Sequence, residues 1–445
     1  MSYPVYGEYK ATRWPEVGHI PTGWEARRLK FSATCNDETL PETTDPDFEM
    51  AYVDISSVGL VNGITAVEVQ TFEKAPSRAR RIVRHGDTLI STVRTYLKAI
   101  APVDAPPENM IVSTGFAVVR PLGFIHSGFL GYALQNTAFI DAVVANSTGV
   151  SYPAINPTSL ICLAVCYPKD KKEQQQIAAF LDWKTGQIDA LIAKKKELMD
   201  KLKEKRLAVI TQAVTKGLNP AAPLRDSGIP WLGAVPAHWD VTYLRWFLRT
   251  GSGDFLSNED MERYPDEIHF IPVVGGNGIM GYTSGWNTDA NCLVAGRVGA
   301  HCGNIHLIRE KCWVTDNALR IGMIDDVFDS EYLYWLLKSM NLNDDANRNA
   351  QPLITGETVK SKKVALPPLS EQKFIADHLT QKTTAIHMMQ AKIESAIARL
   401  TEYRTALITA ATTGKIDVRQ VAIPRQSAQT APTRSTSIDS IACTA

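Results

Sequence analysis

Apolar residues recur at heptad spacing along two long stretches of the chain, the first starting at Ile177 and the second at Ile375. Neither stretch contains an internal proline, and each ends close to a glycine, Gly217 or Gly414. Apolar a and d positions sustained for about five heptads predict a coiled coil rather than a single surface helix. The predicted heptad positions are Ile177, Leu181, Ile188, Leu191, Leu198, Leu202 and Val209, then Ile375, Leu379, Ile386, Met389, Ile393, Ala396, Leu400, Tyr403, Leu407 and Ala410.

The chain also repeats itself. Residues 173–215 recur as residues 371–413 at a constant offset of 198, and residues 18–25 recur as residues 233–240 at an offset of 215. Two copies of a unit of about 200 residues imply a pseudo-twofold object. Because the two helical stretches are homologous, their simplest pairing is with each other, antiparallel, as a rod of roughly 60 Å at 1.5 Å per residue. The alternative is a coil that joins two chains.

The segments between the long helices read as mixed α/β bodies with short strands. β-branched residues broken by Gly and Asn turns support the strands. These are expected at residues 51–55, 87–94, 111–113 and 116–120 in the first body, and at residues 270–274, 292–297 and 304–308 in the second. One short helix is expected in each body, at residues 128–135 and 331–338.

The predicted fold class is therefore α/β: two mixed α/β bodies separated by two long antiparallel coiled-coil helices, with a pseudo-twofold internal repeat. The last segment is rich in Ser, Thr, Ala and Gln, a composition typical of disorder. The predicted parts are a first body at residues 1–167, a long helix at 168–219, a second body at 220–359, a long helix at 360–415 and a disordered tail at 416–445.

Length and composition narrow the class of protein. The chain has 445 residues, of which 44% are hydrophobic and 21% charged, as in a soluble protein of two or three domains. It has no run of about 18 apolar residues, and no basic and then apolar leader follows Met1, so neither a membrane helix nor a signal peptide is predicted. Its seven cysteines form no C-x-x-C pair, which favours a reducing, cytoplasmic location.

The net charge of zero, from 47 basic and 47 acidic residues, at first speaks against a nucleic-acid binder. The charges are unevenly distributed, however. Residues 168–219 and 360–415 each carry a net +5, whereas residues 220–359 carry −8. In the first body, the segment from Lys74 to Lys98 carries a net +6. Such a cluster could lie along a phosphate backbone, where each contact releases counterions; the alternative is a solvated face.

No catalytic motif is found. Thr413-Gly414-Lys415 lacks the upstream glycine of a phosphate-binding loop, and neither an adenine-methyltransferase motif nor G-x-G-x-x-G after a strand occurs. Two histidines and three cysteines within residues 292–312 fit no known metal-ligand spacing. The glycine-rich residues 275–278 could cradle a phosphate, but a turn with positive φ explains them more simply. We expect no catalytic residue, no cofactor and no metal, and a chain that is not an enzyme by itself.

Several motifs in combination point to a known family. The openings are Ile20-Pro21-Thr22-Gly23-Trp24-Glu25 and Val235-Pro236-Ala237-His238-Trp239-Asp240, and the glycine-rich segments are residues 274–282 and 295–304. The most specific motif is Leu366-Pro367-Pro368-Leu369-Ser370-Glu371-Gln372, leading into a helix that ends at Thr412-Thr413-Gly414-Lys415-Ile416. Together they resemble the DNA specificity (S) subunits of type I restriction–modification enzymes, over nearly the whole chain except the tail. The first copy lacks the double proline and the Gly-Gly-Asn-Gly loop, so loop roles cannot be copied between the bodies.

The resemblance implies two target recognition domains, each reading one half of a bipartite site in double-stranded DNA. It also implies that the helices fix the spacer and dock two modification (methyltransferase) subunits, to which restriction (translocase–nuclease) subunits add. We expect the docking faces around residues 187–196 and 381–390. No membrane partner is expected.

Arg, Asn, Gln and His side chains read base edges in the major groove, which selects candidates in both bodies. In the first body we expect Arg78, Arg80, Arg81 and Arg84 near phosphates, and Ser91, Arg94, Tyr96 and Lys98 closer to bases. In the second body the candidates are Asn277, Tyr282, Arg297, His301 and Asn304.

Two other functions stay open from the sequence. The chain could be a non-catalytic coiled-coil adaptor whose bodies bind proteins, and salt would discriminate, because DNA binding falls steeply with salt. A nuclease would need metal-dependent cleavage by the isolated chain, and no carboxylate–lysine constellation supports it. The zero net charge further predicts that the isolated chain binds DNA weakly.

Overall fold

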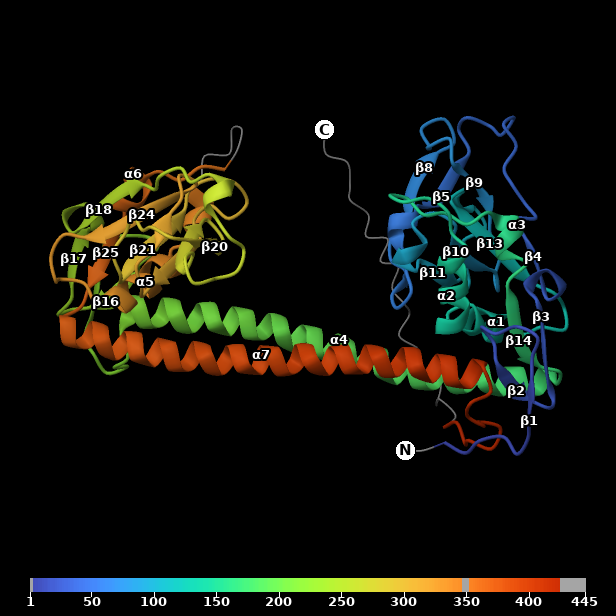
Figure 1. Cartoon of the computed structure of the whole chain (residues 1–445). Coiled ribbons are helices and arrows are strands. Elements are labelled where there is room, and N and C mark those ends of the chain that lie inside the picture. The colour runs from blue at the N-terminus through green and yellow to red at the C-terminus, as the bar shows by residue number, and fades with distance from the viewer. Residues whose placement is uncertain (1–2, 346–351, 425–445) are drawn as a thin grey trace. The chain divides into compact units, whose positions relative to one another are not determined.

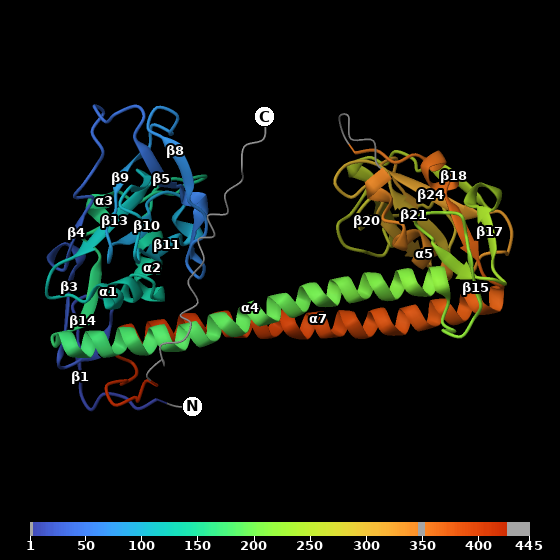
Figure 2. The same cartoon turned by 180° about the vertical axis from the view of Figure 1, so that it is seen from behind.

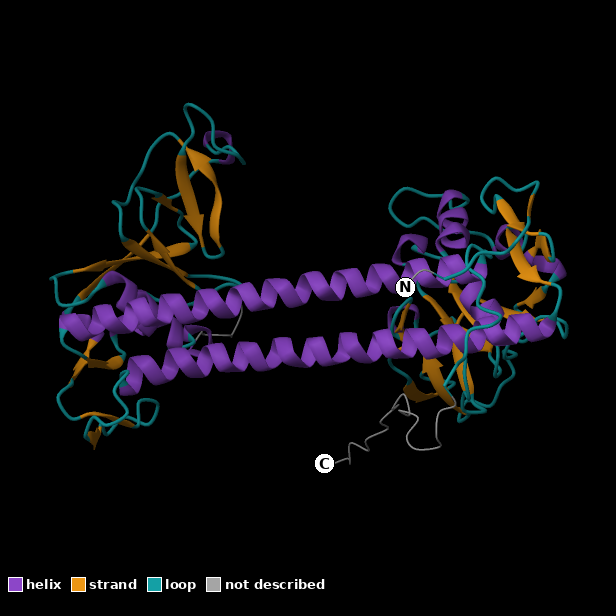
Figure 3. Cartoon of the chain, turned by 90° about the horizontal axis from the view of Figure 1, so that it is seen from below, coloured by secondary structure: helices purple, strands orange, loops and turns teal. Residues whose placement is uncertain are grey.

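The computed structural model describes residues 3–345 and 352–424 (Figure 1). The chain forms two compact units: unit 1 is Met1–Lys194 with Ser395–Ala445, and unit 2 is Lys195–Glu394. Each unit has a body of strands and short helices and includes part of both long helices, α4 (Lys171–Lys216) and α7 (Leu369–Thr412) (Figure 3). In the described part of the chain, no helix is both long and apolar enough to cross a membrane.

The body of unit 1 contains two four-stranded sheets. Their strand orders are β11-β10-β13-β4 and β8-β5-β12-β9, and in the second sheet β12 runs parallel to β5. The expected strands of the first body are confirmed by β5, β10, β12 and β13. The bounds are β4 (Ala33–Cys35), β5 (Glu49–Val53), β8 (Glu68–Thr71), β9 (Ala79–Ile82), β10 (Thr88–Ser91), β11 (Ile100–Pro102), β12 (Met110–Ser113) and β13 (Phe116–Pro121).

The body of unit 2 contains a four-stranded and a three-stranded sheet. Their orders are β18-β24-β21-β22 and β20-β19-β23, and β23 runs parallel to β19. The expected strands are confirmed by β19, β21 and β22. The bounds are β18 (Leu248–Ser252), β19 (Ile271–Gly275), β20 (Gly278–Thr283), β21 (Cys292–Gly296), β22 (Ile305–Ile308), β23 (Trp313–Val314) and β24 (Ala318–Met323).

The two bodies share one topology although their sequences diverge. In each four-stranded sheet the chain enters at one edge (β4 or β18), continues in the third strand (β10 or β21) and its edge neighbour (β11 or β22), and returns in between (β13 or β24). In each second sheet, the strand that follows the first edge strand along the chain (β5 or β19) pairs in parallel with the strand that immediately precedes the returning strand (β12 or β23). The central strands β10 and β21 are buried at all or all but one of their positions, β13 at four of six and β24 at three of six, and most of the buried residues are apolar but not the same in the two bodies.

Smaller elements attach the bodies to the long helices. Strand β14 (Ala164–Pro168) pairs with β3 (Trp24–Arg28) just before α4, and β25 (Lys363–Leu366) pairs with β17 (Asp240–Tyr243) just before α7. The two expected short helices are confirmed as α1 (Ser127–Ala133) and α5 (Ser330–Ser339). The sequence reading missed α2 (Thr137–Ala145), whose side-chain cap Asn136 accepts a hydrogen bond from the Phe139 nitrogen. The remaining short helices are α3 (Pro157–Leu160) and α6 (Gly356–Lys360).

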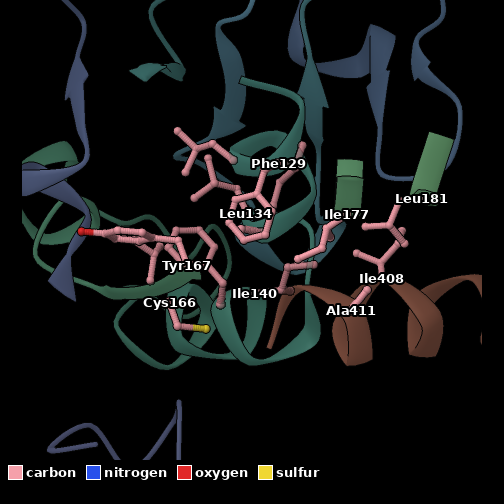
Figure 4. Close-up of a cluster of buried hydrophobic side chains, with 14 of the residues drawn as sticks. Phe129, Leu134, Ile140, Cys166, Tyr167, Ile177, Leu181, Ile408 and Ala411 are labelled. Atoms are coloured by element: carbon pink, nitrogen blue, oxygen red, sulfur yellow. The ribbon is translucent and has the colours of Figure 1, made fainter. Parts of the chain in front are cut away.

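The core of unit 1 joins its body to both long helices. Figure 4 shows Phe129 of α1 and Leu134 close to Ile177 of α4, with Ile408 of α7 nearby, and all four are buried. The start of α4 lies beside the end of α7, because the Gln176 side chain donates to the carbonyl of Val418 just beyond α7. The two helix segments are therefore antiparallel within unit 1.

Unit 2 repeats this construction with the other helix ends (Figure 2). Ile210 and Val214 of α4 and Ile375 and Leu379 of α7 are buried in one core with Tyr332 of α5. The end of α4 meets the start of α7, since a Cβ added at Gly217 would lie 3.1 Å from Oε1 of Glu371. The helix segments are thus antiparallel in this unit too.

The heptad register differs from the predicted one. Leu191, Leu198, Met389 and Tyr403 are each at least 47% exposed, so these four predicted core positions are wrong. In α4 the buried positions instead run through Leu181, Thr185, Ile188 and Ile192, at spacings of four, three and four. Because Thr185 and, in α7, Arg404 occupy buried positions, a pattern of apolar residues alone misplaces the seam.

The expected tail divides at residue 424. Val418 is fully buried in the core of unit 1, and Val421 and Ile423 pack against it. The backbone nitrogen of Asp417 also donates to the Pro4 carbonyl at 2.7 Å. The expectation of a disordered tail therefore does not hold for residues 416–424, while residues 425–445 lie outside the described residues.

Candidate nucleic-acid interface

The Glu-Gln motif at the start of each long helix holds the body in place. In unit 1, Glu173 accepts hydrogen bonds from the indole nitrogen of Trp24 at 2.9 Å and from the Tyr6 hydroxyl at 2.8 Å. Burial, and next the hydrogen bond to Glu173, raise the pKa of Tyr6. In unit 2, Glu371 accepts from the indole nitrogen of Trp239 at 3.0 Å. The repeated tryptophan and glutamate are thus explained by one structural contact.

The glutamine of this motif fixes the short helix above it. Gln174 accepts a hydrogen bond at 2.7 Å from the backbone nitrogen of His126, the residue that caps α1. Gln372 accepts in the same way at 2.8 Å from Asp329, which caps α5. Each glutamine also donates to a backbone carbonyl just before its own helix. The most specific motif in the sequence therefore has a structural role, and the candidate DNA-reading residues lie elsewhere.

The arginine cluster of unit 1 is partly neutralised by carboxylates from outside it. Arg78 forms an ion pair with Asp54 at 2.9 Å, and Arg84 one with Glu38 at 2.7 Å. Hydrogen bonds from Arg120 and then Arg84 lower the pKa of Glu38. Both clustered guanidinium groups remain more than half exposed, at 57% and 65%. They can still reach a phosphate, but in competition with a carboxylate.

The other two arginines of the cluster lie on β9 and are half-buried. The guanidinium of Arg80 lies 4.4 Å from the centre of the Phe72 ring, and Arg81 donates to the Thr39 hydroxyl at 3.2 Å. These contacts hold both side chains close to the sheet. The structure therefore does not bring all four expected phosphate contacts onto one free surface.

The expected base-reading residues of unit 1 follow β10. Ser91 is buried, and its hydroxyl donates to the Val93 carbonyl at 2.6 Å, so it supports the loop and does not face outward. Arg94, Tyr96 and Lys98 are exposed within residues 94–98. The guanidinium of Arg94 lies 4.8 Å from the ring centre of Tyr152, which the sequence reading did not select. The sequence signal that could have identified Tyr152 is its place in the turn-forming segment Gly-Val-Ser-Tyr-Pro.

Three of the five candidates in unit 2 are brought together by glycines. Asn277 is in the β19–β20 turn, and Arg297 and His301 are in the loop after β21. A Cβ on Gly296 would lie 2.2 Å from the His301 carbonyl oxygen and 3.0 Å from that of Gly276, so this close approach of turn and loop requires a glycine. Asn277 and His301 are exposed, and Arg297 is half-buried.

The remaining two candidates differ in position. Asn304 is exposed at the end of the loop after β21, and its carbonyl accepts from the Gly296 nitrogen at 2.9 Å. Tyr282 lies near the far end of β20, where its backbone pairs with that of Glu262 through two 2.8 Å hydrogen bonds. Tyr282 is therefore apart from the turn that carries Asn277.

The loops that carry the candidates occupy equivalent places in the two bodies. The backbone nitrogen of Ile155 donates to the Thr92 carbonyl at 2.8 Å, and that of Ile354 donates to the Arg297 carbonyl at 2.9 Å. The following residues, Val93 and Val298, each form a bridge with the residue before that isoleucine. Arg297 therefore corresponds to Thr92. Positions in the two loops can thus be matched by their backbone hydrogen bonds, although the loop sequences do not align.

The histidines and cysteines of unit 2 do not converge as metal ligands. Within residues 3–345 and 352–424, no group of three or more His, Cys, Asp or Glu side chains could hold a metal ion. His306 lies 3.2 Å from the Gly276 carbonyl oxygen, and burial lowers its pKa. Gly278 has a φ of +95°, so the glycine-rich segment is a hairpin turn that needs a glycine, as expected.

Comparisons with known proteins agree with this architecture. Residues 254–399 match the family described as "Type I restriction modification DNA specificity domain". The chain is 27% identical to the type I restriction enzyme EcoprrI specificity subunit of Escherichia coli over 158 residues, which cover 34% of this chain and 38% of that subunit. It is 23% identical to the putative type I restriction enzyme MjaX specificity subunit of Methanocaldococcus jannaschii over 439 residues, covering 91% and 96%.

A solved structure has the same fold. This structure is described as the "Structural basis underlying complex assembly and conformational transition of the type I R-M system". Its chain superposes on this one with a TM-score of 0.70 at 21% identity, and the match covers 88% of this chain and 98% of that one. The resemblance inferred from the sequence is confirmed by these similarities.

Proposed function

We propose that this chain, a specificity subunit of the type I restriction–modification class, reads a bipartite DNA site with one half-site for each body. The observation that carries the proposal is the shared topology of the two bodies, in which equivalent loops after β10 and β21 bear different polar side chains. Two readers built alike but with different loops are suited to two different half-sites. The loops would enter the major groove, where arginine, asparagine and histidine distinguish base pairs.

The long helices would set the number of unread base pairs between the half-sites. α4 has 46 residues and α7 has 44, and both are continuous. At about 1.5 Å per residue such a helix is roughly 65–70 Å long, and a DNA helical turn spans about 34–36 Å. A fixed helix length would therefore fix a spacer.

Exposed apolar side chains on the long helices support docking of methyltransferase subunits. Leu191 is 50% exposed in the first expected docking face, and Met388 and Met389 are 56% and 54% exposed in the second. Methionine adapts to varied partner surfaces, which suits a docking surface. In this proposal the methyltransferase subunits supply catalysis and additional positive charge, and restriction subunits join through the complex. The chain itself would be a non-catalytic, cytoplasmic, DNA-binding component.

Sequencing of methylated positions in host DNA tests the proposal. A bipartite methylated motif that disappears when the gene is deleted is expected. Lengthening both long helices by one heptad should change the spacer and leave both half-sites unchanged. Unchanged spacing would refute the spacer role, and binding to proteins without salt-sensitive DNA binding would favour an adaptor instead.

A further inference from the structure

The loop after β10 has a backbone that is unusual for its side chains. Arg94 and Lys98 have φ values of +50° and +54°, the left-handed region that L residues rarely adopt. In unit 2, the residue after the equivalent Val298 is Gly299, with a φ of +80°. Glycine adopts this conformation without strain, and unit 2 uses it. Unit 1 keeps an arginine where glycine would suit the backbone better, so a function of its side chain is indicated.

A second loop holds this strained loop in place. Thr148 and Ala154 exchange two backbone hydrogen bonds of 2.9 Å, which close a short turn. The turn is joined to the first loop by the Val93–Ala154 bridge and by the hydroxyls of Thr95 and Ser147, which are 2.8 Å apart. The two loops therefore form one supported surface, called here the double loop (residues 92–98 and 147–154).

The double loop presents a cation that lies over an aromatic ring and forms no ion pair within the described residues. The Arg94 guanidinium lies 4.8 Å from the ring centre of Tyr152, which is 65% exposed. Neither segment of the double loop contains Asp or Glu. Arg78 and Arg84, in contrast, are paired with carboxylates. A stack on an aromatic ring leaves the edge of the guanidinium free and reduces the conformational freedom that it loses on binding.

We propose that Arg94, oriented by Tyr152, reads a guanine in the half-site recognised by unit 1. The inference rests on the proposed function and names a base contact within it. The planar guanidinium would donate two hydrogen bonds to O6 and N7 of guanine, the commonest specific contact in the major groove. Tyr152 is a positioning residue whose ring keeps that plane in one orientation. A phosphate contact by Arg94 is the competing role.

Arg94→Gly is the decisive variant, because glycine fits the left-handed backbone and the fold is retained. The full chain, assembled with its methyltransferase subunits, is tested on duplexes in which each base pair of the methylated motif is replaced in turn. Arg94→Gly should weaken binding to the native site by about tenfold or more. It should also abolish the preference at one G·C pair only. Arg94→Lys should lose that preference too, since lysine offers no planar fork.

Variants of Tyr152 test its positioning role. Tyr152→Phe keeps the ring and should bind like the native complex, whereas Tyr152→Leu should lose several-fold at the same G·C pair. Arg84→Ala is the matched control, because a phosphate contact should weaken all duplexes alike and reduce the salt slope by about one.

Three outcomes overturn the inference. Arg94→Gly could weaken every duplex equally with a reduced salt slope, which identifies a phosphate contact. It could change nothing, or the motif could contain no G·C pair that responds. If the native complex shows no preference among DNA sequences, the proposed function itself fails, which separates the two claims.

Discussion

Units 1 and 2 share a frame and differ in what they expose. Both bury a tryptophan against the helix-start glutamate and use the next glutamine to hold a short helix. They differ at equivalent loop positions, such as the exposed Arg94 against the half-buried Gly299. The repeated residues therefore maintain the junction between body and helix, while the loops that we propose for recognition differ between the units.

The junction should be the most sensitive point of both units. Trp24 and Trp239 are each 1% exposed. Trp24→Ala should destabilise unit 1, and Trp239→Ala unit 2, by about 3–5 kcal/mol each, because a large cavity forms and a part-buried hydrogen bond to glutamate is lost. Hydrogen exchange resolved by segment would measure the two effects separately. Trp246→Ala, at a residue 61% exposed, is the control. A much smaller loss in one unit would contradict a common frame.

The contact between the two long helices differs between the units. In unit 1, Arg404 is 5% exposed and pairs with Asp189 at 3.0 Å. At the offset of 198 the equivalents in unit 2 are Arg206 and His387, so no carboxylate stands at the position of Asp189. Arg404→Ala should lower the free energy of unfolding of unit 1 by about 2–3 kcal/mol, less than for a fully buried pair, because Asp189 is 30% exposed. Arg206→Ala should change that of unit 2 by less than about 0.5 kcal/mol. Chemical denaturation with segment-resolved exchange checks this, and equal effects would refute the asymmetry.

Substitution of the glycines that follow the long helices tests the same junctions, with a smaller expected loss of stability. Gly217 and Gly414 have φ values of +71° and +70°. A Cβ at Gly414 would lie 2.4 Å from Cδ of Pro21, whereas one at Gly217 would lie 3.1 Å from its nearest atoms. Gly217→Ala should therefore cost about 1 kcal/mol for the left-handed backbone, and Gly414→Ala clearly more because of the clash. Thermal unfolding of both variants would rank them, and the reverse order would contradict the geometry.

Much of this frame could be predicted from the sequence. The duplication, the long helices, most strands, and the helices at residues 128–135 and 331–338 follow from repeat offsets and apolar patterns, which report burial directly. The helix register could not, because Thr185 and Arg404 occupy buried positions and only tertiary contacts show that. Tyr152 was missed for a similar reason: it becomes a neighbour of Arg94 only when two loops more than fifty residues apart are joined.

Composition alone also could not predict that residues 416–424 pack against unit 1. Nothing in a Ser- and Thr-rich average singles out Val418, which is buried beyond the end of α7, where its carbonyl accepts a hydrogen bond from the Gln176 side chain. The same holds for the charge cluster. Its net +6 counts residues along the chain, whereas Asp54 and Glu38 neutralise two of its arginines from distant segments.

The smallest expected difference between the units is in how the stability of each depends on acidic pH. Hydrogen bonds from Arg120 and Arg84 hold the pKa of Glu38 below its ordinary value. A carboxylate with a lowered pKa in the folded state stabilises above its unfolded pKa, and this contribution is lost as pH falls through the folded pKa. In unit 2, Gly322 of β24 stands at the position of Arg120, so this network has no counterpart there.

Glu38→Gln should therefore lower the stability of unit 1 by less than about 1 kcal/mol at neutral pH, because the carboxylate is near the surface. This effect should diminish as pH falls through the lowered pKa of Glu38, because the native carboxylate then takes up its proton. Segment-resolved exchange at neutral and acidic pH measures this, with Glu73→Gln, at an exposed carboxylate of unit 1, as the control. A Glu38→Gln penalty that is constant with pH, or that appears in unit 2, would show that the carboxylate charge is not what stabilises this sheet edge.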